Sequence, residues 1–89
     1  MNASVTEVEI WSRAIQPESG NLSPAAAREL LRLRIADEDQ QRARELSSGA
    51  NAGTLTSEET QELDYYLNVG RALEFFKAKA RLSLRDAAS

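Results

Sequence analysis

The stretch that decides the fold is TSEETQELDYYLNVGRALEFFKAKARLSL, residues 56–84. Thr56 followed by Glu59 forms a capping box, in which the two side chains satisfy the first free N–H groups of a helix. The stretch contains no proline, and Gly70 is its one glycine. It therefore predicts one helix over 57–84, about 28 residues and about 40 Å long. Such a helix exceeds the ~12 Å radius of gyration of a compact chain of this size, unless Gly70 bends it.

Three shorter helices are predicted before this stretch. The first, over 4–16, is indicated by apolar residues at helical spacing, namely Val5, Val8, Trp11 and Ile15. The same segment alternates like a strand as far as residue 10, but no partner strand is visible, so the helix is favoured. The second helix covers 24–35, because Ser23 is a suitable N-cap and Pro24 fits the first helical position. The third covers 38–48, with Asp37 as its N-cap and a flexible loop over 47–53 behind it.

These four helices predict an all-α protein. We expect a single domain over 1–89, built as a small bundle of about four helices with a long C-terminal helix. The length of 89 residues leaves room for one small domain.

Composition removes several classes of chemistry. The chain has no cysteine and no histidine, so it has no disulfide, no Cys/His zinc site and no imidazole base. No phosphate-binding loop is present, and carboxylates without Glu-x-x-His pairs do not make a di-iron site. We expect no catalytic residue, no cofactor and no metal, and therefore no enzyme activity. The lack of a long apolar run and of a signal peptide predicts a soluble cytoplasmic protein with no membrane partner.

The net charge of −3 hides an uneven distribution. Residues 36–64 hold eight acidic side chains and two arginines, whereas residues 65–89 hold five basic and two acidic side chains. The basic residues of this last segment are Arg71, Lys77, Lys79, Arg81 and Arg85. Cations are favoured near a helix C-terminus in any case. A nucleic-acid-binding regulator that uses this basic end stays open as an alternative.

The predicted long helix is apolar on two sides. Counted at 100° per residue, one broad stripe of residues forms the expected core, namely Leu63, Tyr66, Leu67, Val69, Gly70, Leu73, Phe76, Ala80 and Leu84. Phe75 and Leu82 lie almost opposite this stripe. With positions 71 and 78 they have the four-three-four spacing of a helix–helix contact. The predicted partner interface, called the seam below, consists of Arg71, Phe75, Ala78, Lys79, Leu82 and Arg85.

Two explanations of the seam are open. In the first, the helix that carries Trp11, or the helix over 24–35, covers Phe75 and Leu82 inside the chain. In the second, the seam is a surface for a partner, because exposed apolar patches on small proteins mark interaction sites. An aromatic residue ringed by arginine and lysine is a common interface anchor.

Four segments of the chain resemble one protein family: IQPESGNLSPAAAR (15–28), GTLTSEE (53–59), LDYYLNVG (63–70) and KAKARLSL (77–84). The family consists of uncharacterised small bacterial proteins of cyanobacterial and planctomycete type, with G-T-L-T-x-E-E and K-x-K-A-R-x-S-L motifs. Ser57 replaces a usual proline and Ala25 a usual glutamate, both at helix starts. Many members are encoded beside an HNH-type endonuclease. The resemblance implies an antitoxin-like or regulatory partner of a nuclease and supplies no catalytic residue.

The leading functional prediction is a non-enzymatic module that binds a protein partner, with an endonuclease as the partner that the resemblance implies. The first alternative is a homodimeric structural protein in which two long helices pair antiparallel through the seam. The second is the nucleic-acid-binding regulator. No small-molecule substrate is expected.

Overall fold

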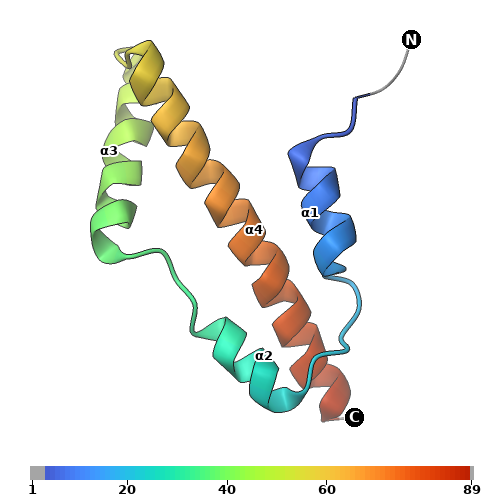
Figure 1. Cartoon of the computed structure of the whole chain (residues 1–89). Coiled ribbons are helices and arrows are strands. Elements are labelled where there is room, and N and C mark those ends of the chain that lie inside the picture. Colours follow the sequence, from blue (N-terminus) through green and yellow to red (C-terminus); the bar gives the residue numbers. More distant parts are fainter. Residues whose placement is uncertain (1–3, 89) are drawn as a thin grey trace. The chain divides into compact units, whose positions relative to one another are not determined.

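The computed structural model describes residues 4–88 and is all-α, which confirms the predicted fold class. No strand occurs within the described range. The elements are α1 (Glu7–Ile15), α2 (Pro24–Leu31), α3 (Asp37–Ala52) and α4 (Ser57–Ala87) (Figure 1). The long C-terminal helix predicted over 57–84 is present and has 31 residues. Gly70 lies inside it.

The first two helices begin at capping residues and end earlier than predicted. Thr6 caps α1 through a capping box with Glu9, so the helix begins at residue 7 rather than 4. Ser23 caps α2 by accepting a hydrogen bond from the N–H of residue 26, as predicted. The prediction that α2 extends to residue 35 is wrong. Its helix ends at Leu31 because the N–H groups of residues 32 and 33 bond three residues back, and Leu33 is exposed.

The third helix differs from its prediction at both ends. Its N-cap residue is Ala36, not Asp37, and no side chain caps it. The C-terminal end lies at Ala52 instead of 48, so the predicted loop over 47–53 is largely helical. Gly53 adopts a left-handed conformation with φ 69°, and it and Thr54 donate backbone hydrogen bonds to the last turn. The glycine that ends the helix is therefore the last one of the segment, and the helix absorbs the earlier Gly49.

The chain divides into two compact units, and each contains part of α4. Unit 1 comprises Met1–Leu33 and Arg71–Ser89, and unit 2 comprises Arg34–Gly70. The single domain over 1–89 stays a prediction. Each unit is described below by itself.

Unit 2 is a hairpin of α3 and the first part of α4. Leu46 is its buried residue. Arg42 donates two hydrogen bonds to Glu62, both at 2.8 Å. This fork lowers the pKa of Glu62 by hydrogen bonding to its charged form, and it raises the pKa of Arg42 for the same reason. The Tyr66 hydroxyl donates to Asp39 at 3.0 Å. The pKa of Tyr66 is raised, mainly because burial desolvates the hydroxyl and secondly because of this hydrogen bond.

The predicted core stripe is only partly correct within unit 2. Leu67 and Val69 are exposed to 46% and 52%, respectively, although both were expected in the core. The reason is that α3 reaches α4 through the polar contacts of Glu62 and Tyr66 and covers a narrower arc than the stripe.

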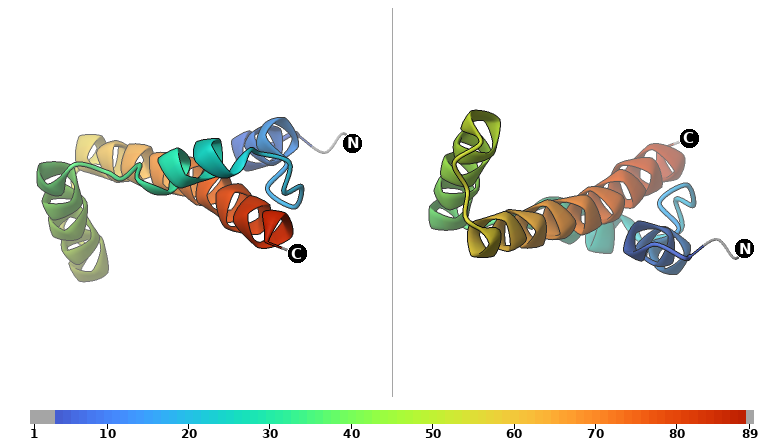
Figure 2. Two further views of the ribbon diagram at one scale, coloured as in Figure 1. Left: turned by 90° about the horizontal axis from the view of Figure 1, so that it is seen from below. Right: turned by 90° about the horizontal axis from the view of Figure 1, so that it is seen from above.

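Unit 1 places α1 and α2 beside the C-terminal part of α4 (Figures 1 and 2). The α1 helix runs in the same direction as α4. Trp11 contacts Phe76, and further along both helices residue 16 contacts residue 79. The buried apolar residues of this unit are Ile15, Ala27 and Ala80. Ala80 was predicted in the core, and the structure confirms it.

The segment between α1 and α2 lies directly on α4. Gly20 lies so close to it that an added β-carbon would be 2.9 Å from the carbonyl carbon and oxygen of Leu82. Two residues later, the N–H of Leu22 donates to the Ser83 hydroxyl at 3.1 Å, and that hydroxyl donates to the carbonyl of Lys79 at 2.7 Å. Glycine is required at position 20 because backbone meets backbone there.

Candidate functional site

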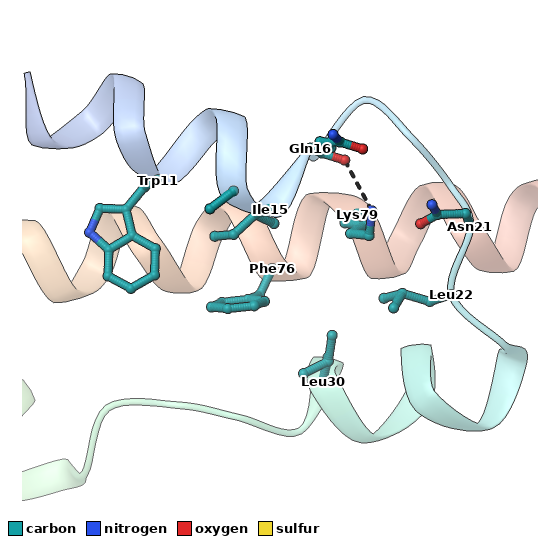
Figure 3. Close-up of a pocket in the computed structure, with 9 residues that line it drawn as sticks. Trp11, Ile15, Gln16, Asn21, Leu22, Leu30, Phe76 and Lys79 are labelled. Atoms are coloured by element: carbon teal, nitrogen blue, oxygen red, sulfur yellow. Dashed lines mark hydrogen bonds between the residues drawn. The ribbon is translucent and has the colours of Figure 1, made fainter. Parts of the chain in front are cut away.

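Unit 1 contains a pocket between α1, α2 and α4 with a volume of about 510 Å³ (Figure 3). This volume lies in the range of ligand-binding clefts in proteins. The pocket is lined by Trp11, Ala14, Ile15, Gln16, Asn21, Leu22, Leu30, Phe76 and Lys79. We call it the α1–α2 pocket. Its lining is mostly apolar, and the polar residues gather at the end where α1 passes into the following segment.

Trp11 forms the aromatic wall of the pocket together with Phe76. Their ring centroids are 6.4 Å apart and the rings are inclined by 70°, an edge-to-face contact. The indole N–H donates to Glu7 one turn earlier at 3.2 Å. Trp11 nevertheless stays 37% exposed, so part of the indole faces solvent. Trp11 is the only tryptophan of the chain.

Lys79 lies at the polar end of the pocket and is only 9% exposed. Its Nζ atom donates to the backbone carbonyl of Gln16 at 3.3 Å (Figure 3). Gln16 has the left-handed conformation, with φ 56°, at the C-terminal end of α1. The ammonium therefore lies where the helix presents free carbonyl groups, which favours a cation. No carboxylate of residues 4–88 forms an ion pair with Lys79.

The structure distributes the predicted seam over three environments. Arg71 and Arg85 are exposed, whereas Lys79 is buried in the pocket; the remaining seam residues, Phe75, Ala78 and Leu82, are half-buried. The ring contact of Trp11 is with Phe76, the neighbour of Phe75 in the sequence. The Leu82 side of α4 is approached instead by Gly20 of the connecting segment.

Most of the exposed large apolar residues of unit 1 lie on α1 and just before it. Four large residues are exposed there: Val5 to 56%, Val8 to 37%, Ile10 to 56% and Trp11 to 37%. We call these residues the α1 apolar surface. Three of them, Val5, Val8 and Trp11, belong to the helically spaced stripe that predicted this helix. The sequence signal for an exposed apolar residue here was Ile10, which lies off the helical stripe and contributes to the strand-like alternation.

The basic end of α4 is only partly available to a partner. Lys79 is buried and Lys77 is half-buried. Arg81 lies 3.9 Å from a carboxylate oxygen of Glu74, and Arg85 lies 3.8 Å from one of Asp86. Both contacts are between exposed side chains and are weak. Nucleic-acid binding stays a prediction, with fewer exposed cations than the sequence suggested.

No group of three or more acidic, cysteine or histidine side chains is arranged to hold a metal ion within residues 4–88. Across the same residues, no helix combines the length and the apolar character needed to span a membrane. Comparison with protein-family models, with curated proteins and with solved structures gave no match. The resemblance to the small bacterial family therefore stays a prediction.

Proposed function

We propose that this protein is a non-enzymatic, cytoplasmic interaction module that binds another protein through α1. The observation that carries the proposal is the α1 apolar surface. A nine-residue helix buries Ile15 alone among its large residues, while Ile10 on the same helix is 56% exposed. Several large apolar side chains exposed on one short helix of a small domain mark a candidate interaction site.

The distribution of these residues around α1 favours a partner with a groove. At 100° per residue, Val8 and Trp11 lie on one side of the helix axis and Ile10 lies on nearly the opposite side. A flat partner surface contacts one side only, whereas a groove that receives the helix contacts both. A helix of this length is about 13 Å long. This is short for an interface of ~800 Å² per partner, with a second copy as with another protein, so the contact must extend beyond α1.

The family resemblance supplies a first partner to test. Its members are often encoded beside an HNH-type endonuclease, and an antitoxin-like or regulatory role would need such a protein contact. The seam stays a second candidate surface. Its apolar members are half-buried in the structure, so we rank it below the α1 apolar surface.

The test measures binding of the purified chain to an HNH-type endonuclease of the kind encoded beside members of the resembled family, by biolayer interferometry, with solution mass from light scattering. Ile10→Glu is expected to weaken binding at least tenfold while the helical circular dichroism is unchanged. Leu67→Glu is the matched control, since it also places glutamate at an exposed apolar position but in unit 2. It should bind like the parent.

Three results would overturn the proposal. Equal loss of binding in Ile10→Glu and Leu67→Glu would make the effect one of charge alone. Loss of binding only in a folded Phe75→Glu, Leu82→Glu double variant would make the seam the contact surface. A concentration-dependent dimer that Ile10→Glu dissociates would make the partner a second copy of the chain.

A further inference from the structure

We propose that the α1–α2 pocket binds a small amphiphilic monocarboxylate, with the carboxylate on Lys79 and the apolar body against Trp11 and Phe76. This inference goes beyond the proposed protein contact. The sequence did not predict a small-molecule site. The burial of Lys79 arises only when α1 folds against α4, and no local pattern shows it.

Lys79 is a buried ammonium group that uses only part of its hydrogen-bonding capacity. An ammonium group has three N–H donors, and Nζ makes one hydrogen bond among residues 4–88, to the Gln16 carbonyl. Removing a charge from water is costly unless it is paired and hydrogen-bonded. Lys79 is more than nine-tenths buried and has no ion-pair partner among residues 4–88. An anion that enters the pocket would supply the missing partner.

Apart from its Lys79 end, the pocket has apolar walls. Ile15, Leu22, Leu30 and the two aromatic rings make the rest of the lining apolar. A fully hydrated inorganic anion would lose its water there without replacement. The side chain of Asn21 lies at the Lys79 end of the pocket (Figure 3), where its amide can donate to a second carboxylate oxygen. The site thus combines one charged end with an apolar body, which is the pattern of an alkyl or arylalkyl carboxylic acid.

The volume of the pocket and the charge of unit 1 both suit a small anionic ligand. A volume of about 510 Å³ exceeds that of one side chain and suits a small ligand. The residues of unit 1 carry eight basic and six acidic side chains, although the whole chain is acidic. The unit that contains the pocket is therefore the one that attracts an anion.

The experiment titrates the protein with octanoate and with octanamide, which has a similar shape but no charge. Trp11 fluorescence reports binding, because this single tryptophan lines the pocket. Isothermal titration calorimetry provides a second readout. Octanoate is expected to bind at least tenfold more tightly than octanamide, since hydrogen bonds to charged groups contribute more than neutral ones.

The variants separate the charge from the cavity. Lys79→Met keeps the length of the side chain and should abolish the preference for the acid, whereas Lys79→Arg should retain it. Lys77→Met is the matched control. It removes the same charge only two residues from Lys79, but the Lys77 side chain does not line the pocket. Leu30→Phe should weaken both ligands by filling the pocket. Circular dichroism confirms that each variant is folded.

The proposal is overturned if acid and amide bind equally, or if neither binds at millimolar concentration. It is also overturned if folded Lys79→Met keeps the preference for the acid. None of these results affects the partner-binding assay with Ile10→Glu, so failure here is distinguishable from failure of the proposed function.

Discussion

Replacing Gly20 with alanine should destabilise unit 1, because the new methyl group has no space. A β-carbon at this position would lie 2.9 Å from the backbone carbon and oxygen of Leu82. Attractive carbon–carbon contacts have separations of about 3.5–4.0 Å. The connecting segment must therefore withdraw by more than half an ångström, since the backbone of α4 cannot yield. Withdrawal would lengthen the hydrogen bond between the Leu22 N–H and Ser83, which is 3.1 Å long.

The magnitude follows from two opposing effects. Overpacking of this kind costs about 1–3 kcal/mol. Alanine also restricts the unfolded chain, which returns about 0.5 kcal/mol. We expect a net loss of about 0.5–2.5 kcal/mol in the free energy of unfolding. For a domain of this size, each kcal/mol shifts the Tm by about 4–8 °C, so the Tm should fall by about 2–20 °C.

The assay is urea and thermal unfolding followed by Trp11 fluorescence, which reports unit 1, and by circular dichroism. Gly70→Ala is the matched control. A β-carbon there meets no atom within 4 Å, and the residue lies inside α4. The same substitution should therefore stabilise the protein by about 0.8 kcal/mol through helix propensity. A Gly20→Ala protein as stable as the parent, or more stable, would refute the close contact of the connecting segment with α4.

Three further substitutions test the packing and the charges. Ile15→Ala should cost about 2–4 kcal/mol in chemical unfolding, whereas Ile10→Ala should stay within about 0.5 kcal/mol; similar losses would contradict the burial assigned to α1. Ser83→Ala should cost about 1–2 kcal/mol, because a buried hydroxyl that both accepts and donates is lost, and unchanged stability would argue against this bond. Since the pKa of Glu62 is lowered below its usual value of 4.5 in the folded state, its contribution is complete above that value and is lost as the pH falls through the folded pKa. Acid titration of Arg42→Met should show less of this loss, and an unchanged profile would remove the ion pair as its cause.

Capping residues predicted two of the helix starts correctly, whereas the cap expected at Asp37 was wrong by one residue. Ser23 with Pro24, and Thr56 with Glu59, each begin a helix at the predicted residue. The errors lie at helix ends that a local sequence pattern does not determine. The third helix continues through Gly49 because Gly53 can take the left-handed conformation that ends it. Periodicity alone does not show which of two nearby glycines has this role.

The candidate sites depended on contacts between distant residues, and sequence patterns predicted them poorly. Periodicity placed Phe76 and Ala80 on the covered side of the last helix, and the structure agrees. It placed Lys79 at the edge of a partner interface, whereas α1 and the segment after it bury this lysine. A helical wheel of α4 has no information on where residue 16 will lie. The exposure of Ile10 was visible as a departure from the stripe, but its use by a partner was not.

The hydrogen bonds from Lys79 to Gln16 and from Leu22 to Ser83 join residues 63 and 61 positions apart. Unit 2, by contrast, is built from contacts about 20 to 27 residues apart. During synthesis, α1 and α2 leave the ribosome well before the part of α4 on which they pack. Because closing long loops is slow, the α3–α4 hairpin should form first and unit 1 last. Until the second half of α4 emerges, the side chain of α1 that the folded chain buries, Ile15, is uncovered, and early encounters with other proteins would fall in that interval.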